Sequence, residues 1–153
     1  MTAYLWVKLL HILSATVLFG TGIGTAYFML RAYLSDNEAT LLDTSKHVVA
    51  ADWLFTTPAV IVQLVTGLWL TIKLGIAFDS WWFRLGLGLY VFVGACWIPV
   101  VWIQIRVRDL IADGAARDEY RRLMRAWMLL GIPAFSSVLV IFVLMVSKYG
   151  LYG

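Results

Sequence analysis

Four long apolar stretches, separated by clusters of charged residues, dominate the pattern of this chain. No Asp, Glu, Lys or Arg occurs in any of the four, which run from Leu9 to Leu30, Trp53 to Ile72, Leu85 to Ile105 and Ala126 to Ser147. Each is about 20 residues long, the length that a helix needs to cross a bilayer core about 30 Å thick. The pattern predicts an all-α four-transmembrane-helix bundle, with helices over about 3–31, 44–74, 80–112 and 117–149.

Composition supports a membrane protein. The chain has 153 residues, of which 62% are hydrophobic and 14% charged, and its mean hydropathy is +0.85. So few polar side chains cannot cover a water-soluble globule of this size. The first apolar stretch is too long for a signal peptide and lacks a cleavage site followed by a polar chain, so we expect it to be retained. Residues 1–153 are therefore predicted to form a single integral membrane domain.

The positions of the basic residues predict the orientation of the bundle across the membrane. The first and third connections carry 8 Lys and Arg, namely Arg31, Lys46, Arg106, Arg108, Arg117, Arg121, Arg122 and Arg125. The other side of the bundle carries 4, namely Lys8, Lys73, Arg84 and Lys148. The positive-inside rule places the richer side in the cytoplasm, giving an N-out/C-out, multi-pass protein of a bacterial-type inner (plasma) membrane. Its cytoplasmic connections are expected to form short amphipathic helix extensions that contact membrane lipids. The net charge of +3 arises from these connections, and no nucleic-acid site is expected.

Residues that can kink helices gather in the predicted inner half of the bundle. They are Gly20, Gly22 and Gly24 of the first helix, and Pro58, Pro99 and Pro133 of the others. A proline inside a helix removes one backbone hydrogen bond and clashes with the carbonyl four residues earlier. The small residues and kinks either let the helices approach closely or splay them to make room for a bulky guest.

The candidate site lies in the predicted outer half. His11 is about 12 Å below the outer end of the first helix, and an ionisable group at such a depth is a functional hypothesis by default. Lys8 lies on the same helix face, three residues earlier. Side chains expected at similar depth are Gln63, Thr66, Arg84, Tyr90, Ser136 and Ser137. The alternative is that His11 only bonds to a neighbouring helix.

The sequence gives less support to a haem site with two histidine ligands, a copper site or a hydrolytic triad. His47 is expected at the cytoplasmic interface, too far from His11 for the two to ligate one haem iron. The methionines form no copper-binding cluster, and no carboxylate in the apolar stretches could complete a hydrolytic triad. Cys96, the single cysteine, is expected to be a buried structural thiol.

The opening Trp6-x-Lys8-x-x-His11 resembles the start of the HemJ-type protoporphyrinogen oxidase family of small bacterial membrane proteins. Weaker similarity extends along most of the chain, through Thr57-Pro58-Ala59, Gly67-Leu68-Trp69-Leu70, Trp82-Phe83-Arg84-Leu85 and the segment from Arg122 to Pro133. The related CopD-like membrane domains share a similar opening. The chain thus looks like an uncharacterised relative of these families.

This resemblance implies b-type haem (haem b) with His11 as the axial iron ligand, and a redox activity related to porphyrinogen oxidation. It also implies a quinone or another respiratory-chain component as redox partner. The family's functional lysine in the third helix is Arg84 here, and arginine cannot lose its proton to act as a base, although it could pair with a propionate. Lys8 and Gln63 would complete the cofactor-binding set. A homodimer would give so small a bundle more room to enclose a haem.

Two other functions remain open. One is a non-enzymatic membrane subunit or scaffold that binds lipid or a partner helix. The other is a CopD-like metal or solute transport component, which would need a continuous polar path through the membrane.

Overall fold

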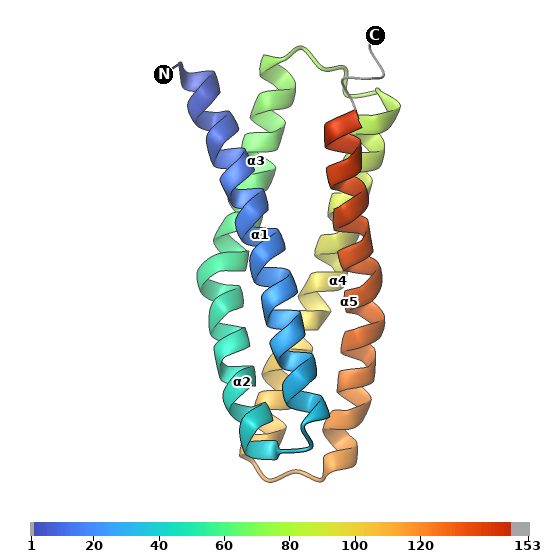
Figure 1. Cartoon of the computed structure of the whole chain (residues 1–153). Coiled ribbons are helices and arrows are strands. Elements are labelled where there is room, and N and C mark those ends of the chain that lie inside the picture. The colour runs from blue at the N-terminus through green and yellow to red at the C-terminus, as the bar shows by residue number, and fades with distance from the viewer. Residues whose placement is uncertain (1, 148–153) are drawn as a thin grey trace.

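The computed structural model describes residues 2–147, which form four long, roughly antiparallel helical columns (Figure 1). The columns are α1 (Ala3–Leu34), a second column made of α2 (Glu38–Ala51), the π-helix η1 (Asp52–Thr56) and α3 (Thr57–Lys73), then α4 (Trp81–Ala112) and α5 (Arg117–Ser147). All four are long and apolar enough to cross a membrane, and residues 2–147 contain no strand. The predicted all-α four-transmembrane-helix class is confirmed. Residues 148 and 149 of the last predicted helix lie outside the described residues.

The second column begins earlier than its sequence pattern suggests. α2 starts at Glu38, six residues before the predicted start at 44. The side chain of Asn37 caps it by accepting a hydrogen bond from the backbone N–H of Thr40 at 3.1 Å. Polar residues made this segment resemble a connection, yet Leu41 and Val48 pack one face of it into the core. Burial of that face stabilises the helix, and the expected amphipathic extension of the first connection is confirmed.

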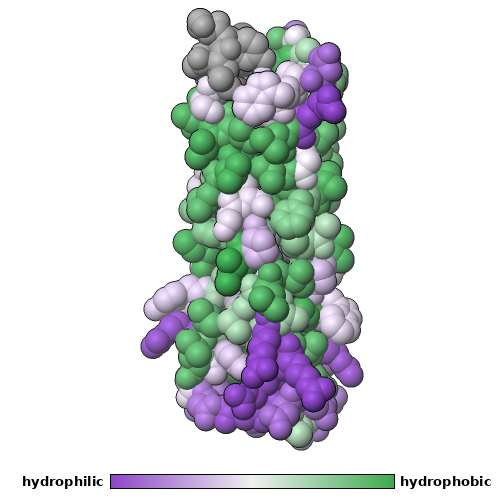
Figure 2. Space-filling view, turned by 90° about the vertical axis from the view of Figure 1, so that its right-hand side faces the viewer, coloured by the Kyte–Doolittle hydropathy of each residue, from purple (hydrophilic) through white to green (hydrophobic). Residues whose placement is uncertain are grey.

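The face of the bundle in Figure 2 is mostly hydrophobic along its length, and hydrophilic side chains gather at its lower end. Large apolar residues project outward along the columns, with Leu129 75% and Val146 78% exposed. Apolar side chains on the outside and a charged end are the arrangement expected of a protein whose sides face lipid. We call the half that contains His11 the upper half, and the half that contains the start of α5 the lower half (Figure 1).

The lower half contains the hydrophobic core. Met29, Val107 and Met124 are fully buried there, and Tyr120 is only 2% exposed. A Cβ atom added at Gly20, Gly22 or Gly24 would meet nothing within 4 Å outside its own helix, so these glycines do not mark a close helix approach. Below them, α1, α2, α4 and α5 pack around one shared core. A cavity lies in the upper half.

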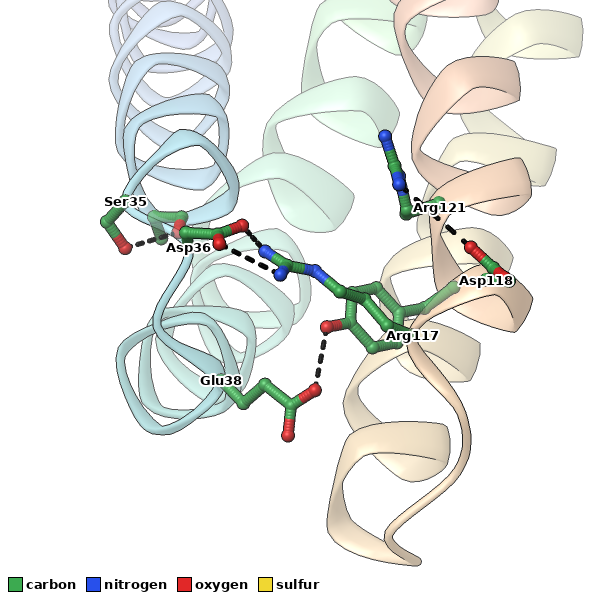
Figure 3. A network of polar contacts seen from close by, with 8 residues as sticks. Ser35, Asp36, Glu38, Arg117, Asp118 and Arg121 are labelled. Carbon is green, nitrogen blue, oxygen red and sulfur yellow. Dashed lines mark hydrogen bonds and ion pairs between the residues drawn. The ribbon is translucent and has the colours of Figure 1, made fainter.

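Polar contacts fasten the lower end (Figure 3). Arg117, the first residue of α5, forms a two-point ion pair with Asp36 in the turn after α1, one contact being a hydrogen bond of 2.9 Å. Beside it, the hydroxyl of Tyr120 donates to the carboxylate of Glu38 at 2.9 Å. These contacts join the first connection of the chain to the beginning of its last helix.

Tyr120→Phe is expected to lower the free energy of unfolding by about 1 kcal/mol, because it removes this hydrogen bond and keeps the buried ring. Thermal unfolding in detergent measures the loss. Arg121→Ala is the matched control on the same helix, since its ion pair with Asp118 is exposed and 4.0 Å long, and it should change stability little. Equal losses in the two variants would contradict a role for the Tyr120 bond.

Pro58 has a local structural consequence, whereas α4 and α5 run without interruption through Pro99 and Pro133. Just before Pro58 the backbone widens into the π-helix, and the N–H of Thr57 bonds to the carbonyl of Asp52, five residues earlier. A wider turn relieves the clash between a proline ring and the preceding carbonyls. The hydroxyl of Thr57 adds a second bond to the same carbonyl at 2.9 Å.

Candidate functional site

A cavity of about 620 Å³ lies in the upper half, between the α1–α3 pair and the α4–α5 pair. Its walls are mostly apolar and include many aromatic side chains. Phe19 of α1 reaches α5, where its ring stacks on Phe135 at 5.4 Å and meets the edge of Phe142 at 5.5 Å. On the opposite side the hydroxyl of Tyr90 in α4 donates to the carbonyl of Val60 in α3 at 2.7 Å. These contacts join the two helix pairs around the cavity, whose size suits a ligand of several rings or a lipid chain.

His11 is part of the cavity wall, and α3 holds its imidazole at both nitrogens. Nδ1 lies 2.8 Å from the hydroxyl oxygen of Thr66, and Nε2 lies 3.1 Å from the amide nitrogen of Gln63. The two partners are three residues apart on α3, which places them on the same helix face. Two expected neighbours of His11 are therefore found in contact with it.

The hydrogen-bond network indicates the protonation state of His11. The hydroxyl of Thr66 donates to the carbonyl of Val62 at 2.6 Å, so it accepts from Nδ1–H. The Gln63 amide N–H then donates to Nε2, while the Gln63 oxygen accepts from the hydroxyl of Ser14. With the Gln63 amide in this orientation, the donors and acceptors match a neutral imidazole with its proton on Nδ1 and its lone pair on Nε2.

Gly67 makes room for the imidazole. A Cβ atom at this position would lie 3.1 Å from Cε1 of His11, closer than most real contacts of a Cβ atom. Gln63, Thr66 and Gly67 therefore share one face of α3. Gln63 and Thr66 contact the two ring nitrogens of His11, and the ring packs against Gly67, which has no side chain. The predicted site did not include Gly67 or Ser14, although Ser14 follows His11 by three residues and is buried.

The two predicted cations lie in different places. Lys8 lines the cavity, and its ammonium is 5.9 Å from the ring centroid of Tyr4. Arg84, in the first turn of α4, is exposed and does not line the cavity. Of the predicted cofactor-binding set, the structure brings together Lys8, His11 and Gln63 and leaves Arg84 apart.

The remaining candidates are not part of this cavity. His47 is exposed in the lower half beside Asp43, at 3.7 Å, and Cys96 is buried in α4. Ser136 and Ser137 donate to carbonyls of their own helix. Within residues 2–147 no three His, Cys, Asp or Glu side chains are grouped so as to hold a metal ion.

Four apolar helical columns around a core and a cavity define a multi-pass integral membrane protein. The chain belongs to the family described as predicted integral membrane protein (DUF2269), whose model matches residues 5–149. No curated protein and no solved structure matches the chain.

Proposed function

We propose that this protein binds b-type haem in the upper cavity, with His11 as the iron ligand. The observation that carries the proposal is the position of His11 at a large cavity, where its Nδ1 lies beside the hydroxyl of Thr66 and its Nε2 beside the amide nitrogen of Gln63. Histidines that ligate metals commonly donate their other N–H to a fixed acceptor, which sets the tautomer and the ring orientation. Thr66 is such an acceptor.

The residues around the cavity suit a porphyrin. Aromatic side chains of α1, α4 and α5 would pack against its apolar faces, and the ammonium of Lys8 would pair with a propionate. The amide of Gln63 would leave Nε2 and become available to a polar substituent. Haem would supply one-electron redox chemistry, for which a quinone or another respiratory-chain component is the partner we propose. Oxidation of a porphyrinogen is the activity that the HemJ resemblance suggests.

The test is the absorption spectrum of the protein purified in detergent, before and after addition of haem. We expect a Soret band that His11→Ala reduces at least tenfold at equal protein concentration. His47→Ala is the matched control, because His47 is exposed in the other half, and it should keep the band. A reconstituted protein without a Soret band, or a full band in His11→Ala, would overturn the proposal.

A second candidate is a non-enzymatic membrane component that binds a lipid chain in the same cavity. One observation favours it: both nitrogens of His11 already bond to side chains of α3, as in a purely structural histidine. Native mass spectrometry distinguishes the two, since retained lipid in a protein that takes up no haem supports this candidate. Metal or solute transport, the third alternative, has no comparable observation in its favour.

A further inference from the structure

A carboxyl group is buried inside the second membrane span. Asp52, the first residue of the π-helix, is 5% exposed and directly precedes the apolar stretch that begins at Trp53. Lys46 lies six residues nearer the lower end, about 9 Å at 1.5 Å per residue. Asp52 is therefore above the basic residues that mark the lower boundary of the apolar stretches.

The groups that approach this carboxyl are neutral. The hydroxyl of Thr56 donates to Oδ1 of Asp52 at 2.9 Å. The indole N–H of Trp97 in α4, which is buried and makes no hydrogen bond within residues 2–147, lies near the same carboxyl. The four ion pairs among residues 2–147 use other acidic residues, namely Asp36, Asp43, Asp109 and Asp118.

No formally charged group faces Asp52 from the neighbouring helices at this depth. α1 has no Asp, Glu, Lys, Arg or His between residues 12 and 30, and neither do α4 between 85 and 105 and α5 between 126 and 147. The titratable side chains in these stretches are Tyr27, Tyr90 and Cys96. A carboxylate ion without a cation or bulk water is far less stable in such surroundings than a neutral carboxylic acid.

We propose that Asp52 is an intramembrane proton-binding site, with its carboxyl group protonated at neutral pH. Oδ1 accepts the hydrogen bond of Thr56, and the proton resides on Oδ2. The wide π turn places the side chain inside the bundle, and such turns frequently occur at functional sites.

This proton site lies between the predicted cytoplasmic end and the upper cavity. Gln63, which contacts His11, is eleven residues further along the same column, about 16 Å away. The polar side chains of Thr56, Gln63 and Thr66 follow Asp52 on the second column toward the cavity. The proposal does not depend on which ligand the cavity binds.

Infrared difference spectroscopy of the protein in lipid vesicles at neutral pH tests this assignment. The spectrum of Asp52→Asn minus wild type should show the loss of one C=O stretching band of a neutral carboxylic acid. Asp43→Asn is the matched control, because Asp43 is exposed beside His47, and it should lose carboxylate bands instead. Loss of carboxylate bands in Asp52→Asn would overturn the proposal.

Thr56→Val provides a second measurement if Asp52→Asn does not fold. Valine has nearly the same shape as threonine but cannot donate to Oδ1. We expect the C=O band of the neutral acid to move to higher frequency, because its oxygen loses a hydrogen bond. A change confined to the carboxylate bands would show that Asp52 is ionised and would contradict the assignment.

Discussion

Gly67→Val should displace the imidazole of His11 from its position against α3. Even the first carbon of the new side chain would lie 3.1 Å from Cε1 of the ring, and the two methyl groups of valine need further space. We expect a loss of about 1–3 kcal/mol in the free energy of unfolding, the usual cost of overpacking. If haem binds, the Soret band should fall along with it, because the Thr66 bond that orients the ring would break.

Gly88→Val is the control for this prediction. Gly88 is also a helical glycine in the upper half, but a Cβ atom there would meet nothing within 4 Å. Thermal unfolding in detergent compares the two variants, and the nitrogen chemical shifts of His11 in labelled protein report whether the ring keeps its Nδ1–H tautomer. Unchanged shifts in Gly67→Val would show that the ring does not need the space that glycine provides.

Met124→Ala is expected to be the most destabilising of the single changes considered. Met124 is fully buried in the lower core, and truncation of a buried methionine to alanine typically costs about 2–5 kcal/mol. The loss should appear as a lower midpoint of thermal unfolding. It should leave the affinity of the folded protein for a cavity ligand nearly unchanged, because Met124 belongs to the core and not to the cavity.

Leu129→Ala tests whether burial is the cause. Leu129 lies on the same helix, five residues further along, but is 75% exposed on the outer surface. Its truncation removes contacts with detergent or lipid and leaves no cavity inside the protein, so stability should change by less than about 1 kcal/mol. Similar losses in Met124→Ala and Leu129→Ala would contradict the division into core and lipid-facing positions.

The four crossings could be predicted because a lipid-facing helix needs a continuous run of apolar residues, and the chain has four such runs. The amphipathic extension before residue 44 could also be predicted, but not its start at Glu38, because the charged residues of α2 lie on the outer side while Leu41 and Val48 pack inward. Asp52 was missed for a related reason. In a hydropathy pattern a charged residue indicates the end of a span, whereas the π-helix places Asp52 inside the bundle.

The candidate site was predictable in part. Depth along each helix correctly suggested that Gln63 and Thr66 could meet His11. The role of Gly67 depends on the register between α1 and α3, which depth alone does not determine. The position of Arg84 depends on the rotation of α4 about its axis, and that rotation leaves the side chain outside the cavity.

The uneven packing of the two halves has a mechanical consequence. The lower ends of the columns are held together by the core and by the contacts of Arg117 and Tyr120. In the upper half the cavity separates the α1–α3 pair from the α4–α5 pair. There the two pairs are joined by the Phe19 ring contacts and by the hydrogen bond of Tyr90. We therefore expect the two helix pairs to separate more readily beside the cavity than at the lower core.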